Sequence, residues 1–336
     1  MTIDFLTVLI TVFSLLILLI PGFVLTKAKM LTQKAGDCLS VLVLYACQPA
    51  LIFMSFQKKG FDSSIALNMV YVALLTLFVH LIIIGVVLVL FRNKNDDEKK
   101  FKIKNVVKFA TVFSNMGYMG FPFLQMLFTG TYEADILIYG AAAVSIFNIF
   151  NWSFGLYLIT GDIKEMSPKK AFLNPTFISI IIGLASFLII KTPIVDIANH
   201  MPKLDSFLEK FMNSVNMLGN SVTPLAMIII GIKLANIKLN ELLLNKWAYI
   251  ACFMKLIVTS LISILVVAFI PVDTIVKYAI FFCMSMPSAT ATSMFAIKYN
   301  SDSEFASVCV LLSTILSIIT IPVMFIVLSQ VFGVVI

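Results

Sequence analysis

Residues 115–122 read Asn115-Met116-Gly117-Tyr118-Met119-Gly120-Phe121-Pro122, in the middle of an uncharged run from Phe109 to Tyr132. A second uncharged run, from Tyr278 to Ile297, is interrupted by Met286-Pro287-Ser288-Ala289-Thr290-Ala291-Thr292. Glycine and proline destabilise helices and leave backbone N–H and C=O groups without partners. Inside a bilayer such breaks persist only where protein or a water-filled cavity meets the freed groups. Interrupted segments at corresponding positions of two halves indicate the binding site of a transporter.

The composition is that of a polytopic membrane protein. Of the 336 residues, 60% are apolar and 12% are charged, whereas soluble domains carry about 25% charged residues. A spanning helix needs about 20 apolar residues. Ten apolar runs approach or exceed that length, and among them only the eighth contains a charged residue, Lys255: Phe5–Leu25, Cys38–Gln57, Ser63–Phe91, Phe109–Tyr132, Ile136–Thr160, Ala171–Ile190, Phe211–Ile232, Trp247–Ile270, Tyr278–Ile297 and Phe305–Ile336.

Motifs of metal sites, disulfide frameworks and enzymes are missing from the sequence. The five cysteines are scattered and show no CxxC spacing, so neither a zinc site nor a disulfide framework is expected. No HExxH, GxSxG or phosphate-binding glycine loop occurs. The first apolar run lacks a preceding basic region, so we interpret it as a retained helix. We expect no cofactor, no bound metal and no enzymatic activity.

The basic residues predict the orientation of the chain. Connections after the odd-numbered runs hold 17 of the 24 lysines and arginines, and the termini and even-numbered connections hold 6. Because cytoplasmic connections are rich in lysine and arginine, both termini are expected outside the cell membrane. The basic connection from Arg92 to Lys108 is interpreted as a determinant of this topology, in preference to a lipid-binding or nucleic-acid-binding patch. We therefore expect a bilayer environment and no nucleic-acid partner.

The ten runs divide into two groups of five at the polar linker 161–170. The predicted units are residues 1–160, a short cytoplasmic linker, and residues 171–336. An odd number of spans per unit makes the second unit enter from the opposite side, which gives inverted repeats. Gln48-Pro49 in the second run corresponds to Thr223-Pro224 in the seventh, and the two interrupted runs are the fourth and the ninth.

The direction of the two breaks predicts the charge of the ligand. The fourth and ninth runs are antiparallel, so we expect them to cross near the midplane. Each second half-helix begins after its break with free amides and the positive end of a dipole. Two such ends facing one cavity favour an anion, and neutral side chains supply further hydrogen bonds there: Asn115, Ser288, Thr290 and Thr292.

These breaks resemble motifs of the auxin efflux carrier family, which includes the plant PIN exporters and many prokaryotic carriers. Asn115 to Pro122, followed by Phe123-Leu124, resembles the family's fourth-helix signature. Met286-Pro287, with the later stretch Phe295 to Asn300, resembles its ninth-helix break. The resemblance covers essentially the whole chain, and three proline-containing stretches also fit: Asn174-Pro175, Thr223-Pro224-Leu225 and Ile321-Pro322.

The resemblance implies ten helices arranged as a scaffold and a transport domain, and it suggests a homodimer. In that family the crossing helices hold a substrate carboxylate, and Asn115 matches the asparagine that contacts it in plant members. Known members carry organic anions such as indole-3-acetate or dicarboxylates. Unlike the long plant exporters, this chain has a central connection of about ten residues, and its third run contains His80 but no acidic residue. Carboxylate-based proton coupling is therefore not implied.

Several polar residues have structural interpretations beside functional ones. Asn115 is predicted to contact substrate, although amides also join helices. His80 is a possible proton relay, and Lys255 is expected to extend its charge to the cytoplasmic interface. The full predicted substrate site comprises Gln48, Asn115, Gly117, Gly120, Pro122, Thr223, Pro287, Ser288, Thr290 and Thr292, whereas Asn148 and Asn151 are expected to join helices.

The sequence thus predicts a secondary transporter that exports small organic anions by elevator-type alternating access. One alternative is a sodium-coupled organic anion importer with a related inverted-repeat fold. Another is a membrane sensor or channel that does not transport by turnover. Sodium dependence distinguishes the first alternative, and counterflow exchange distinguishes the second.

Overall fold

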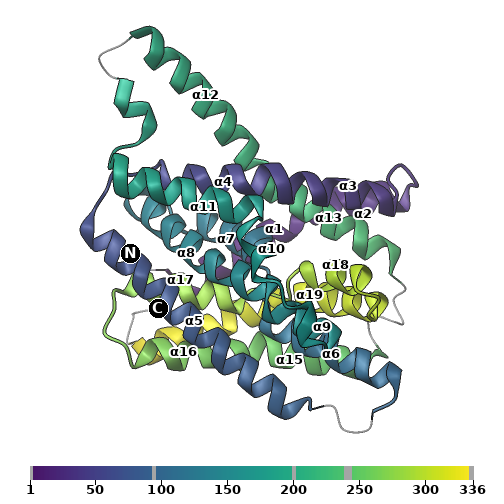
Figure 1. Cartoon of the computed structure of the whole chain (residues 1–336). Helices are drawn as coiled ribbons and strands as arrows, with labels where there is room; N and C mark the ends of the chain where they lie inside the picture. Colours follow the sequence, from purple (N-terminus) through teal and green to yellow (C-terminus); the bar gives the residue numbers. More distant parts are fainter. Residues whose placement is uncertain (1–2, 93–95, 199–201, 238–243, 333–336) are drawn as a thin grey trace.

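The computed structural model describes residues 3–92, 96–198, 202–237 and 244–332 (Figure 1). These residues are almost entirely helical and contain one isolated β-bridge and no strand. In the view of Figure 1, α18, α9 and α6 lie on the right. The expectation of an all-α protein is confirmed for the described residues.

Seven helical segments of the described residues are long and apolar enough to cross a membrane: Phe5–Lys27, Gln33–Phe56, Ser63–Leu90, Gly130–Trp152, Ser206–Asn236, Lys246–Ala268 and Ser303–Phe332. They coincide with seven of the ten predicted runs. The remaining three runs are the two interrupted ones and Pro175–Ile190, which forms a shorter apolar helix. Helix length alone therefore supports seven spans, because a broken segment does not form one long helix.

The described part of the first half contains nine α-helices, two of which continue from π turns at Val43–Cys47 and Met116–Gly120. The helices are α1 (Phe5–Ile17), α2 (Leu19–Lys27), α3 (Gln33–Leu42), α4 (Gln48–Phe56), α5 (Ser63–Leu90), α6 (Glu98–Val112), α7 (Phe121–Leu127), α8 (Glu133–Trp152) and α9 (Phe154–Thr160).

The described part of the second half contains two further π turns, Ser186–Ile190 and Met254–Val258. Its helices are α10 (Pro168–Phe172), α11 (Pro175–Ala185), α12 (Pro202–Asn220), α13 (Val222–Asn236), α15 (Lys246–Phe253), α16 (Thr259–Ala268), α17 (Thr274–Ser285), α18 (Ala291–Lys298) and α19 (Ser303–Phe332). The predicted linker contains a 3₁₀ turn at Ile163–Glu165 and the start of α10. The predicted seventh run is divided at Ser221 into α12 and α13.

Polar residues at helix starts explain where several helices begin. Asp62 accepts hydrogen bonds from the amides of Ser64 and Ile65 at the start of α5, and these bonds hold the pKa of Asp62 below its usual value. Asn174 caps α11 in the same way. At α19 the Asp302 carboxylate accepts from the amide of Phe305, at 3.0 Å. Such caps satisfy first-turn N–H groups that have no helical acceptor.

Glycine allows α2 and α13 to pack backbone against backbone. A Cβ atom added at Gly22 would lie 2.2 Å from the Ile228 carbonyl oxygen, and one added at Gly231 would lie 2.1 Å from that of Leu19. Small residues give this kind of close approach between membrane helices. Helix α4 packs against α11 and α12. These five helices form one packed group beside the crossing of the broken segments (Figure 1).

Candidate functional site

The two interrupted segments meet at their breaks. Ser114 and Ser288 form an isolated antiparallel β-bridge. The Asn115 amide donates to the Pro287 carbonyl at 2.8 Å, and the Ala289 amide donates to the Phe113 carbonyl at 2.8 Å. Each break thereby satisfies backbone groups that the other break has freed, as non-helical backbone within a membrane requires. The two interrupted segments therefore meet at their breaks, as the sequence predicts.

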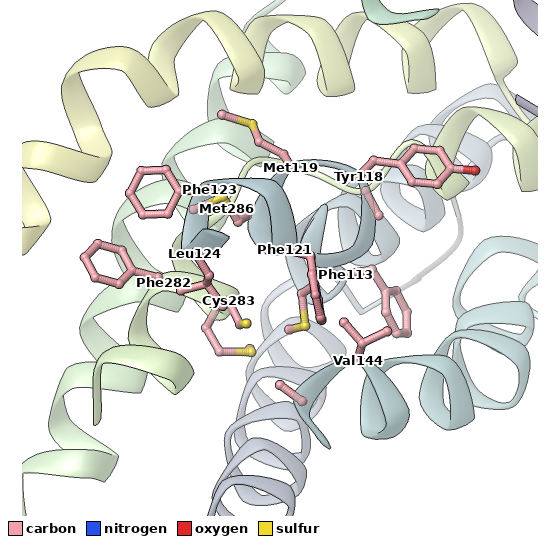
Figure 2. Close-up of a cluster of buried hydrophobic side chains, with 14 of the residues drawn as sticks. Phe113, Tyr118, Met119, Phe121, Phe123, Leu124, Val144, Phe282, Cys283 and Met286 are labelled. Atoms are coloured by element: carbon pink, nitrogen blue, oxygen red, sulfur yellow. The ribbon is translucent and has the colours of Figure 1, made fainter. Parts of the chain in front are cut away.

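Apolar side chains enclose the half-helix that follows the first break (Figure 2). The Phe123 ring lies against the Phe282 ring of α17, with centroids 5.0 Å apart. Met286 lies under Gly120, where an added Cβ would be 3.1 Å from the Met286 side chain. Close packing of this kind holds α7 and its preceding π turn in one position. The crossing is thus a rigid part of the core.

A cavity of about 220 Å³ lies beside the crossing. Both second half-helices present their N-terminal ends to it, through Gly117 and Tyr118 of the first segment and Thr290 and Ala291 of the second. The first N–H groups of a helix have no acceptor in their own helix and carry partial positive charge. This end of the cavity therefore carries partial positive charge from the backbone, without a charged side chain.

Two buried amide side chains on the cavity have atoms without a hydrogen-bond partner. The Asn115 Nδ2 donor and the Asn151 Oδ1 acceptor are both unpaired, and the two residues are 3% and 4% exposed. Buried polar groups are usually paired, so unpaired ones that line a cavity are available to a ligand or to water. An amide donor beside two helix N-termini suits a carboxylate.

The expectation that Asn148 joins two helices is wrong. Its Nδ2 donates to the Val144 carbonyl of its own helix at 3.0 Å, and its side chain lines the cavity. Asn151, one helical turn later, lines the same cavity. The two side chains share one face because residues three apart are neighbours on a helix, and that face of α8 looks into the cavity.

The opposite end of the cavity is aromatic and basic. The Trp152 and Phe295 rings lie 4.9 Å apart, and the Lys298 ammonium lies over the Trp152 ring at 5.8 Å from its centroid. All three residues line the cavity. A cation near an aromatic face is attracted to it, and an exposed lysine at the mouth of a cavity also attracts anions.

Comparison with known proteins identifies the family of this chain. The family described as "Membrane transport protein" matches residues 7–325. The chain belongs to this family, the auxin efflux carriers. An uncharacterized transporter of Methanocaldococcus jannaschii is 22% identical over 311 residues, which cover 92% of this chain and 95% of the relative. An uncharacterized transporter of Methanothermobacter thermautotrophicus is 24% identical over 323 residues, or 95% and 97% of the two chains.

In this member of the family, four of the predicted site residues line the cavity: Gln48, Asn115, Gly117 and Thr290. Gln48 and Gly117 depend on each other, because a Cβ at Gly117 would lie 2.1 Å from Gln48 Nε2. The glycine therefore allows the Gln48 amide to lie over the start of the half-helix. Contact of these residues with substrate remains a prediction.

The other predicted residues lie outside the lining of the cavity. Ser288 donates to the Ala110 carbonyl at 2.9 Å, and Thr292 donates to the Ala289 carbonyl at 2.7 Å. Pro287 supplies its carbonyl to Asn115. These hydrogen bonds stabilise the crossing without lining the cavity. The remaining three are Gly120 and Pro122, packed in the core of the first break, and Thr223, partly exposed at the start of α13.

His80 is fully buried behind the crossing. Its ring stacks on Phe150 with centroids 5.4 Å apart, and its Nδ1 lies 2.8 Å from the Thr76 carbonyl. Its Nε2 has no hydrogen-bond partner. Among the described residues no ion pair involves His80, and a role as proton relay stays a prediction.

Lys255 does not extend to the interface, so that expectation is wrong. The residue is fully buried, and its ammonium donates to the Ser114 hydroxyl and the Thr111 carbonyl. The reason is the π turn Met254–Val258, which directs the side chain toward the first break. The sequence of a spanning helix does not reveal which neighbouring helix a lysine near its end will face.

Other cavity residues were not predicted. Trp152 lies within the predicted run Ile136–Thr160, and Lys298 directly follows the run Tyr278–Ile297, where a basic residue is ordinary. Tyr45 and Met294 carry no signal of their own, although both line the cavity. Among the described residues, no group of three histidine, cysteine, aspartate or glutamate side chains is placed to hold a metal ion.

Proposed function

We propose that this chain is a secondary transporter that exports small organic anions across the cell membrane. The observation that carries the proposal is the cavity onto which two half-helix N-termini and the unpaired Asn115 amide converge. Backbone N–H groups and a neutral amide bind a carboxylate by hydrogen bonds. The aromatic rings at the other end accommodate the apolar or ring-bearing part of such an anion.

The proposed architecture is ten spans in two inverted repeats of five. Exchange of the repeats converts the first span into the sixth and the seventh into the second. Helix α2 of the first span packs against α13 of the seventh, and α4 of the second packs against α11 of the sixth. These two contacts are equivalent under that exchange, and so is the meeting of the fourth and ninth spans. The packing therefore supports a duplicated, inverted fold.

The proposed transport movement is that of an elevator. Spans one, two, six and seven form the scaffold. The other six spans, which include the two broken ones, form the moving part. With both termini outside, the Lys298 and Asn174 side of the cavity faces the cytoplasm, which makes this an inward-facing state. On the outer side Lys59 pairs with Asp135 at 2.9 Å, and Lys58 pairs with Glu133. Both pairs join the scaffold to the moving part and must break as it slides.

Export is the direction that the membrane potential favours for an anion. An inside-negative potential assists exit by about 2.3 kcal/mol per charge per 100 mV. Import against that potential would require a coupling ion. Uncoupled export thus needs only the binding site and the movement described above.

Counterflow in proteoliposomes tests the proposal. Vesicles loaded with an unlabelled mono- or dicarboxylate, with malonate and indole-3-acetate among the probes, are diluted into labelled substrate, with sodium or with choline. The proposal predicts accumulation of label that is driven by the internal substrate and is equal in both salts. Uptake without stimulation by internal substrate would indicate a channel, binding without uptake a sensor, and a requirement for sodium the coupled importer.

A further inference from the structure

A buried lysine joins the proposed scaffold to the proposed moving part. Lys233 lies on α13 of the seventh span and is 8% exposed. Its ammonium donates to the hydroxyl of Ser293, on α18 of the ninth span, at 3.1 Å. Because α13 belongs to the scaffold and α18 to the moving part, this hydrogen bond crosses the interface along which the two parts slide.

The same hydroxyl connects Lys233 with the wall of the cavity. Ser293 donates to the Thr290 carbonyl at 3.1 Å, and Thr290 lines the cavity at the start of α18. Lys233 and Ser293 are not themselves part of the cavity lining. Lys233 therefore contacts the half-helix whose N-terminus faces the cavity, and it does so without occupying the place of a ligand.

The partner of Lys233 is a neutral group. None of the ion pairs in the part of the chain that the structure describes involves Lys233, and Asp37 of α3 acts on it electrostatically from an exposed position. A buried ion pair is strongly destabilised when one partner is taken away, whereas a hydrogen bond between an ammonium and a hydroxyl is easier to break. Such a bond favours one arrangement of the two parts and can still open in every transport cycle.

The contact suits only one position of α18 along the membrane normal. One helical turn nearer the cytoplasm, the same face of α18 carries Ile297, whose side chain cannot accept a hydrogen bond. An outward slide by one turn, about 5.4 Å, brings Ile297 opposite Lys233 in place of Ser293. We propose that the Lys233–Ser293 hydrogen bond is a latch that holds the carrier in the inward-facing state and opens when α18 moves outward. The inference rests on the proposed function and adds the pair of residues that sets the balance between its two states.

Four variants separate the latch from ordinary packing. Lys233→Met and Ser293→Ala each remove one partner, and the flexible methionine side chain fills the space of the lysine stem. Ser293→Asp supplies the carboxylate that the natural latch lacks, which makes the hydrogen bond stronger. Asn236→Ala is the matched control, one turn after Lys233. Its side chain donates to Gln33 and to the Ile232 carbonyl, both within the scaffold.

The test is the distance between two spin labels in the full-length protein, measured by pulsed electron–electron double resonance in liposomes without substrate. One label is attached to each part at an exposed lysine, through Lys34→Cys in α3 of the scaffold and Lys99→Cys in α6 of the moving part. The background is Cys38→Ser, because Cys38 is exposed and the other four cysteines are buried. The measured quantity is the proportion of molecules that show a second distance beside the main one.

We expect the doubly labelled parent protein and Asn236→Ala to give the same main distance. Lys233→Met and Ser293→Ala should each raise the proportion of the second distance about tenfold, because each removes a hydrogen bond to a charged group. The double variant should raise it no further, since both changes break one contact. Ser293→Asp should lower the proportion and slow counterflow exchange.

Three results would overturn the inference. They are a proportion in Lys233→Met equal to that of the parent protein, effects of Lys233→Met and Ser293→Ala that add in the double variant, and a higher proportion in Ser293→Asp. The two Ser293 variants give an answer even if Lys233→Met does not fold. Because the distances are measured without substrate, failure of the latch is separate from failure of the proposed transport, which counterflow of the wild type decides.

Discussion

The two sides of the helix crossing are built from the same pair of breaks, yet they differ in charge and in packing. On the cavity side two half-helix N-termini meet open space, and the Asn115 amide has an unpaired donor. On the rear side the Lys255 ammonium donates to the Thr111 carbonyl near the end of α6 and to the Ser114 hydroxyl, which donates to the Met284 carbonyl near the end of α17. A broken helix always creates both ends. The comparison teaches that one end can be left for a ligand only if the other is compensated by the protein.

The largest effect on stability is expected at the rear side. Ser114→Ala removes the donor to the Met284 carbonyl and one of the two acceptors of the Lys255 ammonium, which keeps only the Thr111 carbonyl. Loss of a hydrogen-bond partner costs a buried polar group about 1–3 kcal/mol, and more where that group is charged. We expect a clearly lower unfolding temperature in a thermal denaturation experiment.

Ser221→Ala is the matched control for that variant, because the Ser221 hydroxyl donates only to the Met217 carbonyl of its own helix. It should unfold close to the wild-type temperature. Equal stability of the two variants would mean that the rear side is not a compensated site, and the contrast between the two sides would be lost.

A smaller effect on stability, together with an effect on binding, is expected on the cavity side at Gly117. Gly117→Ala places a Cβ where Gln48 Nε2 now lies, 2.1 Å from the ideal position. The flexible Gln48 side chain must move, and overpacking of this kind costs about 1–3 kcal/mol. Thermal unfolding and carboxylate affinity should both decrease.

Gly85→Ala serves as its control, since an added Cβ there meets no atom within 4 Å. Alanine in a helix is favoured over glycine by about 1 kcal/mol, so this variant should be as stable as the wild type or slightly more stable. If Gly117→Ala behaves like Gly85→Ala, the Gln48 amide does not depend on that glycine.

The smallest effect is expected at the mouth of the cavity. Lys298→Gln removes an exposed charge that lies over the Trp152 ring. Exposed cation–π contacts contribute about 0.5–1 kcal/mol, so stability should hardly change. Carboxylate affinity measured by calorimetry should fall about two- to fivefold at low salt, and the difference should shrink as ionic strength rises. A loss that does not depend on salt would argue against electrostatic attraction.

The features that could be predicted from the sequence are those set by the backbone preferences of glycine and proline and by the apolar runs. Gly117, Pro122 and Pro287 are unfavourable inside a membrane helix, so their presence marks both breaks. The two runs that contain these breaks are antiparallel, which predicts that the free helix ends meet. The ten apolar runs include all seven candidate spans found among the described residues, and helix length does not support the other three.

The rest depends on which side chains face each other across helices. Lys255 was assigned to the interface because its distance from the end of the run allowed this, but the π turn at Met254–Val258 directs it inward. Asn148 and Asn151 looked like ordinary polar contacts, because sequence does not show that their face of α8 meets a cavity. Thr223 was paired with Gln48 by pattern, yet it lies at a helix start away from the cavity.

The most direct test of the account is the affinity of Asn115→Ala for a carboxylate that binds the wild type, measured by calorimetry. Asn220→Ala, which removes an exposed amide at the end of α12, is the matched control. A hydrogen bond to a charged ligand contributes about 1.5–3 kcal/mol. The account therefore predicts an affinity about 10- to 100-fold weaker for Asn115→Ala, with an unchanged unfolding temperature in the absence of ligand. Equal affinity of the wild type and a folded Asn115→Ala would contradict it.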